Sequence, residues 1–148
     1  MTNSWRDHLL ETREQIDALL SRVHSVAVLG IKTADFPGEP AYYVPLYAQR
    51  AGLKIFPVPV YFPEATEILG EPVHRRVADI ATPVDLVNVF RRSDKVAAHV
   101  DDILAARPLA VWMQEDIRDD VAAERFARAG IDVVQDRCLF VELRDRGR

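Results

Sequence analysis

Basic side chains follow two apolar segments of the chain directly. Arg91 and Arg92 come immediately after the segment 84–90, and Lys32 stands two residues beyond Gly30, which ends a shorter apolar segment. Guanidinium groups and the free N–H groups at the start of a helix both bind phosphate and carboxylate oxygens. The pattern therefore predicts an anion site built from two loops.

Each of these cations also has an ordinary explanation. One arginine of the pair could be solvated while the other pairs with a carboxylate, and a single lysine in a loop usually faces solvent. The position of Arg91 and Arg92 beyond a buried strand favours the functional interpretation, whereas Lys32 alone is weak support.

The segment 25–30, Ser-Val-Ala-Val-Leu-Gly, has the composition of a buried strand that stops at a glycine. It is typical of the first strand of a dinucleotide-binding fold, where the chain turns sharply and a phosphate approaches the backbone. The usual run of glycines is absent, because the next glycine after Gly30 is Gly38. The segment therefore indicates the fold strongly, whereas it supports NAD binding only weakly.

The end of the next apolar segment, 53–58, discriminates between nucleotides. An NAD site places an Asp or Glu there to accept hydrogen bonds from the ribose hydroxyls. Here Pro57 and Val58 occupy the position, and no acid follows until Glu64. Such a surface can hold an adenine ring and tolerate a phosphate on the ribose, so an ordinary NAD site is disfavoured.

Other reactive side chains carry less weight. Cys138 could be a reactive thiol, although a buried structural cysteine is favoured, and Asp85 and Asp136 are more readily explained as caps or salt-bridge partners than as acids or bases. The histidines lack metal-ligand spacing; they are His8, His24, His74 and His99.

Strands and helices alternate along the chain, and this order must position the loops. Apolar segments predict five strands, at 25–30, 53–58, 84–90, 109–113 and 131–134. Helices are predicted at 5–21, 42–51, 93–107 (capped by Ser93) and 119–129, with a helical turn at 64–69 and a closing helix, rather than an edge strand, at 137–143.

This alternation predicts an α/β fold of the three-layer, Rossmann-like, doubly wound type. The sheet should be mainly parallel and five-stranded, with helices on both faces. Ligands of such sheets bind beyond the carboxyl ends of the strands, where the strand order reverses. The loops with Lys32 and with Arg91 are therefore expected to lie together.

Length and composition limit the classes of function. The 148 residues suit one domain, residues 1–148, and the net charge of −4 argues against general nucleic-acid binding. No apolar run approaches the roughly 20 residues that cross a bilayer, and the N-terminus lacks a signal-peptide core. With a single cysteine, these features lead us to expect a cytoplasmic protein that does not bind membranes.

Taken in order, these segments resemble the CoA-binding domain family, small Rossmann-fold proteins similar to the CoA-binding domain of the succinyl-CoA synthetase α subunit. The resemblance runs from about Ser25 to Glu142. Its most specific segment is 83–93, Pro-Val-Asp-Leu-Val-Asn-Val-Phe-Arg-Arg-Ser, and Trp-Met-Gln at 112–114 and Asp-Arg-Cys at 136–138 follow it.

The resemblance implies bound coenzyme A or an acyl-CoA, with the pyrophosphate over the turn after the first strand and the adenine at the end of the second. An acid at that second position would repel the 3′-phosphate of CoA, so its absence agrees with this interpretation. No catalytic residue or metal ligand is expected. The expected site residues are Gly30, Ile31, Lys32, Thr33, Pro57, Val58, Phe90, Arg91, Arg92, Ser93 and Gln114.

The chain departs from the family pattern at several places. Relatives usually have Asn-Pro and a basic residue where residues 59–61 are Pro-Val-Tyr. Their first turn often reads Leu-Ser-Pro-Lys, against Ile-Lys-Thr-Ala at 31–34, and Asp116 replaces their usual glycine.

Three functions follow as hypotheses. The leading one is a small CoA-binding protein that is non-catalytic or accessory, because one domain has no room for a second catalytic unit. The alternatives are an NADP-dependent oxidoreductase, with Arg91 and Arg92 on the 2′-phosphate, and a regulatory or interaction protein that has lost its ligand. The sequence identifies no protein partner.

Overall fold

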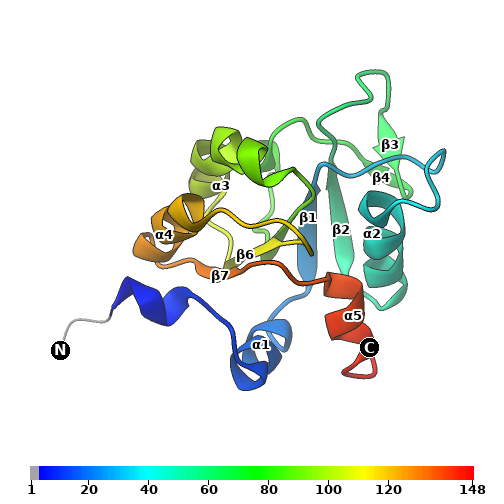
Figure 1. Ribbon diagram of the computed structural model, residues 1–148. Coiled ribbons are helices and arrows are strands. Elements are labelled where there is room, and N and C mark those ends of the chain that lie inside the picture. Colours follow the sequence, from blue (N-terminus) through cyan, green and yellow to red (C-terminus); the bar gives the residue numbers. More distant parts are fainter. Residues whose placement is uncertain (1–3) are drawn as a thin grey trace.

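A five-stranded parallel sheet forms the centre of the molecule in the computed structural model, which describes residues 4–148 (Figure 1). The strand order is β2-β1-β5-β6-β7, and every neighbouring pair is parallel. The strands are β1 (Ser25–Leu29), β2 (Lys54–Val58), β5 (Leu86–Val89), β6 (Ala110–Met113) and β7 (Asp132–Val134).

Burial on both faces explains the apolar sequences of the central strands. Every residue of β5 and of β6 is buried, which is the usual state of a parallel sheet covered on two sides. The one polar residue in these two strands is Asn88, and it is fully buried.

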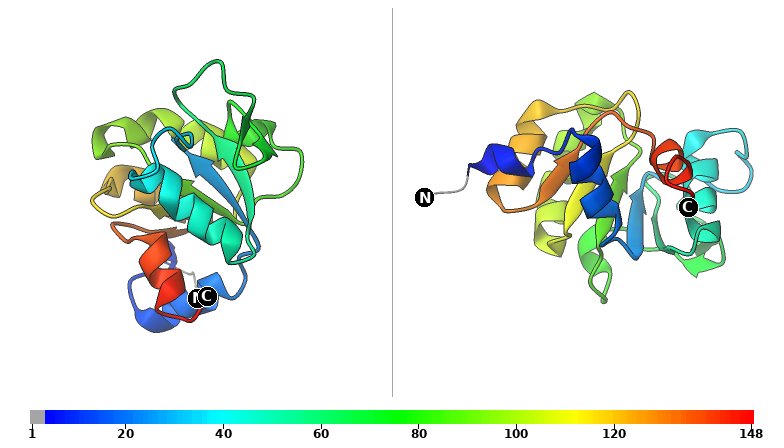
Figure 2. Two further views of the ribbon diagram at one scale, coloured as in Figure 1. Left: turned by 90° about the vertical axis from the view of Figure 1, so that its right-hand side faces the viewer. Right: turned by 90° about the horizontal axis from the view of Figure 1, so that it is seen from below.

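Helices cover both faces of the sheet, which confirms the predicted three-layer, doubly wound fold (Figures 1 and 2). One apolar core joins the sheet to α1 (Arg13–Leu20), α2 (Pro40–Arg50) and α5 (Leu139–Arg144). A second core joins the opposite face to the 3-10 helix η3 (Ser93–His99), α3 (Val100–Ala106) and α4 (Asp120–Arg128). The closing helix expected at 137–143 is α5.

The prediction of one continuous helix at 5–21 is wrong, because two separate elements occupy this range. A 3-10 helix, η1 (Trp5–His8), comes first, and α1 starts separately at a capping box formed by Thr12 and Gln15. Between them the Leu10 N–H donates to Val133 O at 2.8 Å, so the chain runs along the edge strand β7 instead of coiling. Pairing with the open sheet edge competes successfully with helix formation here.

The helical turn expected at 64–69 is also wrong. The segment forms a small antiparallel hairpin of β3 (Glu67–Ile68) and β4 (Glu71–Pro72). Leu69 and Gly70 connect the strands with positive φ values of 56° and 76°, the backbone of a tight hairpin turn. A short 3-10 helix, η2 (Val77–Asp79), leads from the hairpin towards β5.

The strand order reverses at β1. From β1 the chain passes to β2 on one side of it and later returns to β5 on its other side. In sheets of this kind the loops beyond the carboxyl ends of these strands diverge to opposite faces and leave a crevice between them. Here those are the loops that follow β1 and β5.

Candidate functional site

The turn after β1 is fixed by its backbone. Gly30 has φ +89°, and a Cβ atom there would lie 2.4 Å from the carbonyl oxygen of Phe90. The Gly30 N–H donates to Val58 O and the Phe90 N–H donates to Leu29 O, both at 2.8 Å. Only glycine fits this place, where the ends of three neighbouring strands are held together.

Beyond Gly30 the turn presents little side chain to solvent. Ile31 is 1% exposed and belongs to the core, and the Lys32 N–H donates to Ala41 O in α2 at 3.1 Å. The hydroxyl of Thr33 is buried, and no hydrogen-bond partner for it exists among the described residues. An unpaired buried hydroxyl is costly.

The cation of this turn is neutralised within the protein. Lys32 Nζ lies 2.9 Å from Glu39 Oε2 and 5.2 Å from the centre of the Phe36 ring. Glu39 is the residue that precedes α2, and its side chain makes no hydrogen bond to the helix. The carboxylate is therefore available to Lys32 rather than committed to capping the helix.

Arg91, at the end of β5, is held differently. Its Nε donates to His99 Nε2 at 3.2 Å and its Nη1 to the Tyr61 hydroxyl at 3.4 Å, and the guanidinium carbon lies 5.7 Å from the centre of the Tyr61 ring. None of the ion pairs within residues 4–148 involves Arg91. Its positive charge is therefore not cancelled.

His99 must be neutral to accept this bond. Burial lowers the pKa of His99, and the nearby Arg91 charge lowers it further, while Asp102 acts in the opposite direction. A depressed pKa favours the unprotonated ring, whose Nε2 lone pair faces the guanidinium.

The neighbouring arginine, Arg92, is an exposed side chain that pairs with a carboxylate. Arg92 Nη2 lies 3.3 Å from Asp94 Oδ2, with the two side chains 75% and 68% exposed. The prediction that Ser93 caps the following helix is wrong, because its hydroxyl accepts a hydrogen bond from the Arg118 N–H at 3.0 Å instead. Of the arginine pair, Arg92 is solvated and paired with a carboxylate, whereas Arg91 pairs with no carboxylate of the described residues.

Two amide side chains meet below the end of β6. Gln114 is 4% exposed, and its Oε1 accepts from Asn88 Nδ2 at 3.4 Å and from the Leu139 N–H at 3.3 Å. The Asn88 oxygen is buried and has no partner among the described residues. Two donors on Oε1 orient the Gln114 amide so that its NH₂ group remains available.

Asp116 stands where the family resemblance predicts a glycine. It has φ +70°, and its N–H donates to the Asp136 carboxylate at 2.7 Å. This is the left-handed backbone that favours glycine. The position keeps its conformation, supported by Asp136, and adds a negative charge to the edge.

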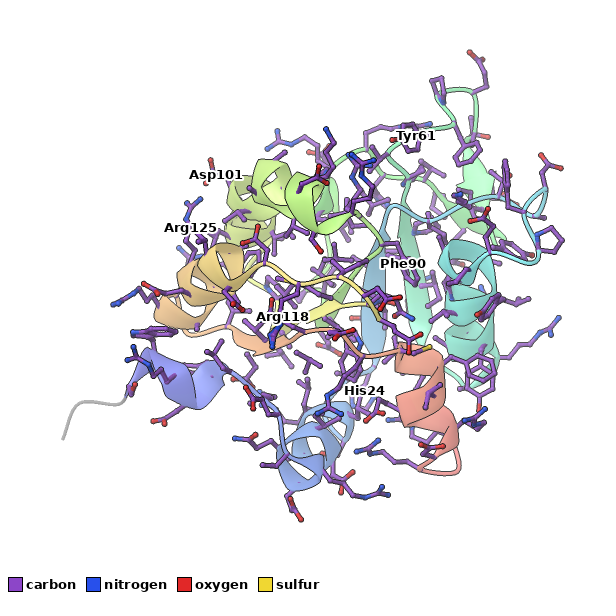
Figure 3. The ribbon with its side chains drawn as sticks, in the orientation of Figure 1. His24, Tyr61, Phe90, Asp101, Arg118 and Arg125 are labelled. Carbon is purple, nitrogen blue, oxygen red and sulfur yellow. The ribbon has the colours of Figure 1, made fainter. Side chains whose placement is uncertain are left out.

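These loops surround a cleft of about 420 Å³ at the point where the strand order reverses. Six of the expected site residues line it: Lys32, Phe90, Arg91, Arg92, Ser93 and Gln114. The other lining residues are Glu39, Pro40, Ala41, Glu115, Asp116 and Ile117. Phe90, which is labelled near the centre of the view in Figure 3, lies against the turn at Gly30.

A second, smaller cavity of about 240 Å³ lies on the other side of the β1 turn. Thr33 lines it, together with Tyr42 of α2 and residues of the β3–β4 hairpin. The turn that follows Gly30 thus has a cavity on either side.

The structure places two expected contact residues in the interior. Pro57 and Val58 are buried, and their carbonyl oxygens accept from the N–H groups of His74 and Gly30, at 2.9 and 2.8 Å. Contact between these side chains and an adenine ring stays a prediction. The exposed aromatic group beyond β2 is Tyr61, 64% exposed, which lies at the upper edge of the molecule in Figure 3.

Sequence reasoning missed three residues around this cleft. Asn88 had a signal, because a lone amide interrupts the apolar run Leu-Val-Asn-Val. Tyr61 stands out in the sequence only as a departure from the family pattern. Nothing in the sequence around His99 indicates a role at this site, because its contact with Arg91 is visible only in the folded structure.

The remaining candidates serve the fold. Asp85 accepts from the N–H groups of His24 and Ser25, at 2.7 and 3.2 Å, and Cys138 is a half-buried free thiol that precedes α5. Within residues 4–148 no group of three or more acidic, histidine or cysteine side chains could hold a metal ion. None of the helices in that range is both long and apolar enough to span a bilayer.

Comparison with known proteins gives consistent matches over nearly the whole chain. Residues 24–144 match the family described as CoA binding domain. The uncharacterized protein YneT of Bacillus subtilis (strain 168) is 29% identical over 130 residues, which is 88% of this chain and 93% of that protein.

Two solved structures have the same fold. The Thermus thermophilus protein cell-free ID.343 is 36% identical, with a TM-score of 0.82 over 91% of this chain and 98% of its own. A hypothetical protein from Pyrococcus horikoshii OT3 is 25% identical, with a TM-score of 0.83 over 98% of both chains.

Proposed function

The chain belongs to the CoA binding domain family, and on that premise we propose that it binds coenzyme A or an acyl-CoA at the carboxyl edge of its sheet. The observation that carries the proposal is Arg91, a cation that has no carboxylate partner within residues 4–148 and lies in the cleft where the strand order reverses. CoA carries a pyrophosphate and a 3′-phosphate, and guanidinium groups bind phosphate oxygens well.

The end of β2 supports CoA over NAD. The residues there are Pro57, Val58 and Pro59, all buried, so no carboxylate stands ready for a free ribose diol. We propose that the pyrophosphate lies over the turn after Gly30, whose buried Thr33 hydroxyl lacks a partner among the described residues. The cavities on either side of this turn suit an elongated ligand that crosses it.

We propose a binding or accessory role rather than catalysis. The carboxylates that line the cleft are Glu39, which is paired with Lys32, and Glu115 and Asp116, which are exposed to water. General bases more often occupy desolvated positions that match their pKa to the reaction. On this proposal the ligand is held and presented, and another protein performs any chemistry on its acyl group.

A thermal-shift panel with CoA, acetyl-CoA, NAD and NADP tests the proposal. A site with micromolar affinity should stabilise the fold by about 4 kcal/mol at millimolar ligand. We expect this with CoA or acetyl-CoA and not with NAD. Stabilisation by NADP but not CoA would replace the proposal with the oxidoreductase alternative, and no shift with any ligand would favour a protein that has lost its ligand.

A further inference from the structure

The three cations that line the cleft have different partners. Lys32 and Arg92 each lie within 4 Å of a carboxylate, at 2.9 and 3.3 Å. Arg91 instead has two uncharged partners, the His99 ring and the Tyr61 hydroxyl. A carboxylate neighbour would cancel the charge that a phosphate needs, whereas neutral partners restrain the side chain and leave its charge intact.

The two partners leave part of the guanidinium free. Arginine has five N–H donors in a rigid plane, and here Nε serves His99 while one Nη1 hydrogen serves Tyr61. No hydrogen bond from Nη2 of Arg91 occurs among the described residues. The cleft is lined by Arg91 but not by Tyr61 or His99, so the partners hold the group without filling the cleft.

The loop that carries Tyr61 is itself fixed by a side chain. Arg75 donates to the carbonyl oxygens of Tyr61, Phe62, Pro63 and Ala65, at 3.4, 3.1, 3.2 and 2.7 Å. Phe62 adopts φ +62° within this loop. Four carbonyl groups gathered on one guanidinium give a loop without regular structure a defined shape, and so give an exposed tyrosine a defined position.

We infer that Tyr61 and His99 are positioning residues that hold Arg91 as an uncancelled cation, with its remaining N–H groups presented to an anionic group of the ligand. The inference rests on the proposed function only in that the ligand is anionic.

Ionisation of Tyr61 gives a readout that a merely structural residue would not give. The hydrogen bond from Arg91 and its charge lower the pKa of Tyr61; desolvation acts in the opposite direction, and the charges of Arg92 and Lys95 lower the pKa further. Once ionised, the phenolate would pair with Arg91 and cancel its charge. Affinity for an anion should therefore fall as the pH rises through the pKa of Tyr61, unless position 61 is a phenylalanine.

The experiment measures binding of inorganic pyrophosphate, and in parallel CoA, to wild type, Tyr61→Phe and Tyr43→Phe from neutral to alkaline pH. Tyr43 is a matched control, because it is also an exposed tyrosine and lies on α2 rather than against Arg91. Deprotonation of Lys32 and Lys95 affects all three proteins alike. Ring resonances of ¹³C-labelled tyrosine give the pKa of Tyr61 in unliganded wild type and Arg91→Met.

We expect Tyr61→Phe to weaken pyrophosphate binding roughly two- to tenfold at neutral pH, the worth of one hydrogen bond, and to lose part of the alkaline decline. Tyr43→Phe should match wild type, and Arg91→Met should raise the pKa of Tyr61. The inference is overturned if wild type does not bind pyrophosphate, if Tyr61→Phe binds as tightly as wild type, or if Arg91→Met leaves the Tyr61 pKa unchanged.

Failure of the proposed function has a different signature. One outcome is that pyrophosphate binds and the Tyr61 effects appear, but CoA does not bind. This outcome would support the positioning role of Tyr61 and His99 and contradict the assignment of CoA as the ligand. If CoA binds with the same affinity to wild type and Tyr61→Phe at every pH, the ligand assignment stands and the positioning role falls.

Discussion

The loops after β1 and after β5 follow adjacent parallel strands at the same edge of the sheet, but different kinds of contact fix their conformations. In the first, the path is set by backbone: Gly30 packs against the Phe90 carbonyl group, and its lysine is paired with Glu39. In the second, side chains set the arrangement: Arg91 is restrained by Tyr61 and His99 and keeps its charge. The first loop gives the cleft its shape and the second gives it its charge.

This division separates the effects that substitutions should have. Changes in the loop after β1 should act mainly on the free energy of unfolding, because they disturb contacts among three strands. Changes in the loop after β5 should act mainly on ligand affinity, because its cation contributes little to holding the fold together. Substitutions in each loop, paired with matched controls, can therefore show whether shape and charge are separate.

The largest effect is expected from Gly30→Ala. The new Cβ would meet Phe90 O at 2.4 Å in a residue with positive φ, so strain and overpacking add up. Together they should cost on the order of 3 kcal/mol of the free energy of unfolding, measured by urea denaturation.

Gly52→Ala is the matched control, since Gly52 has φ +101° but a Cβ atom added there would meet no atom of the described residues within 4 Å. It should carry only the backbone strain, about 1–2 kcal/mol. Equal losses for the two variants would mean that the contact with Phe90 is not what restricts position 30.

Arg91→Met should have the largest effect on binding. A charge-assisted hydrogen bond contributes about 1.5–3 kcal/mol, so CoA affinity measured by calorimetry should fall roughly ten- to a hundredfold with little change in stability. Arg92→Met is its control: Arg92 is exposed and already paired with Asp94, and its loss should change affinity by less than about fivefold. Equal losses would contradict the assignment of separate roles to the two arginines.

A smaller effect, and a gain, is expected from Glu39→Gln. Removing the carboxylate releases Lys32 from its ion pair and adds an uncancelled cation to the first loop. CoA affinity should rise a few-fold, within the roughly 1 kcal/mol that an exposed pair contributes. The side chain of Glu39 does not cap α2, so the thermal midpoint should change little. Unchanged or weaker binding would show that Lys32 does not act on the ligand.

The sheet and the cations at its carboxyl edge were predictable because their signals are local. Runs such as Val-Ala-Val-Leu-Gly at 26–30 identify buried strands, and the alternation with helices sets parallel pairing. The cations that follow two of those strands were therefore placed correctly at one edge. The hairpin at β3 and β4 was missed because two-residue strands are too short to show a periodicity.

The partners of those cations could not be predicted, because they depend on distances between segments remote in sequence. Tyr61 and Arg91 are 30 residues apart, and their contact requires the loop conformation that Arg75 imposes. The same limit applies to burial: Pro57 and Val58 suggest a surface for adenine but are covered in the folded chain. Apolar character alone does not distinguish a binding surface from the core that it resembles.

Binding of CoA in the cleft between the two loops should depend on the uncancelled charge of Arg91. Calorimetric titration of CoA into the wild-type protein and Arg91→Met, repeated at increasing salt, tests this dependence. We predict saturable binding of one CoA per wild-type chain that weakens as salt screens the phosphate contacts. No binding heat at millimolar CoA, or binding that is indifferent to salt and to the loss of Arg91, would contradict the proposed role of this cleft.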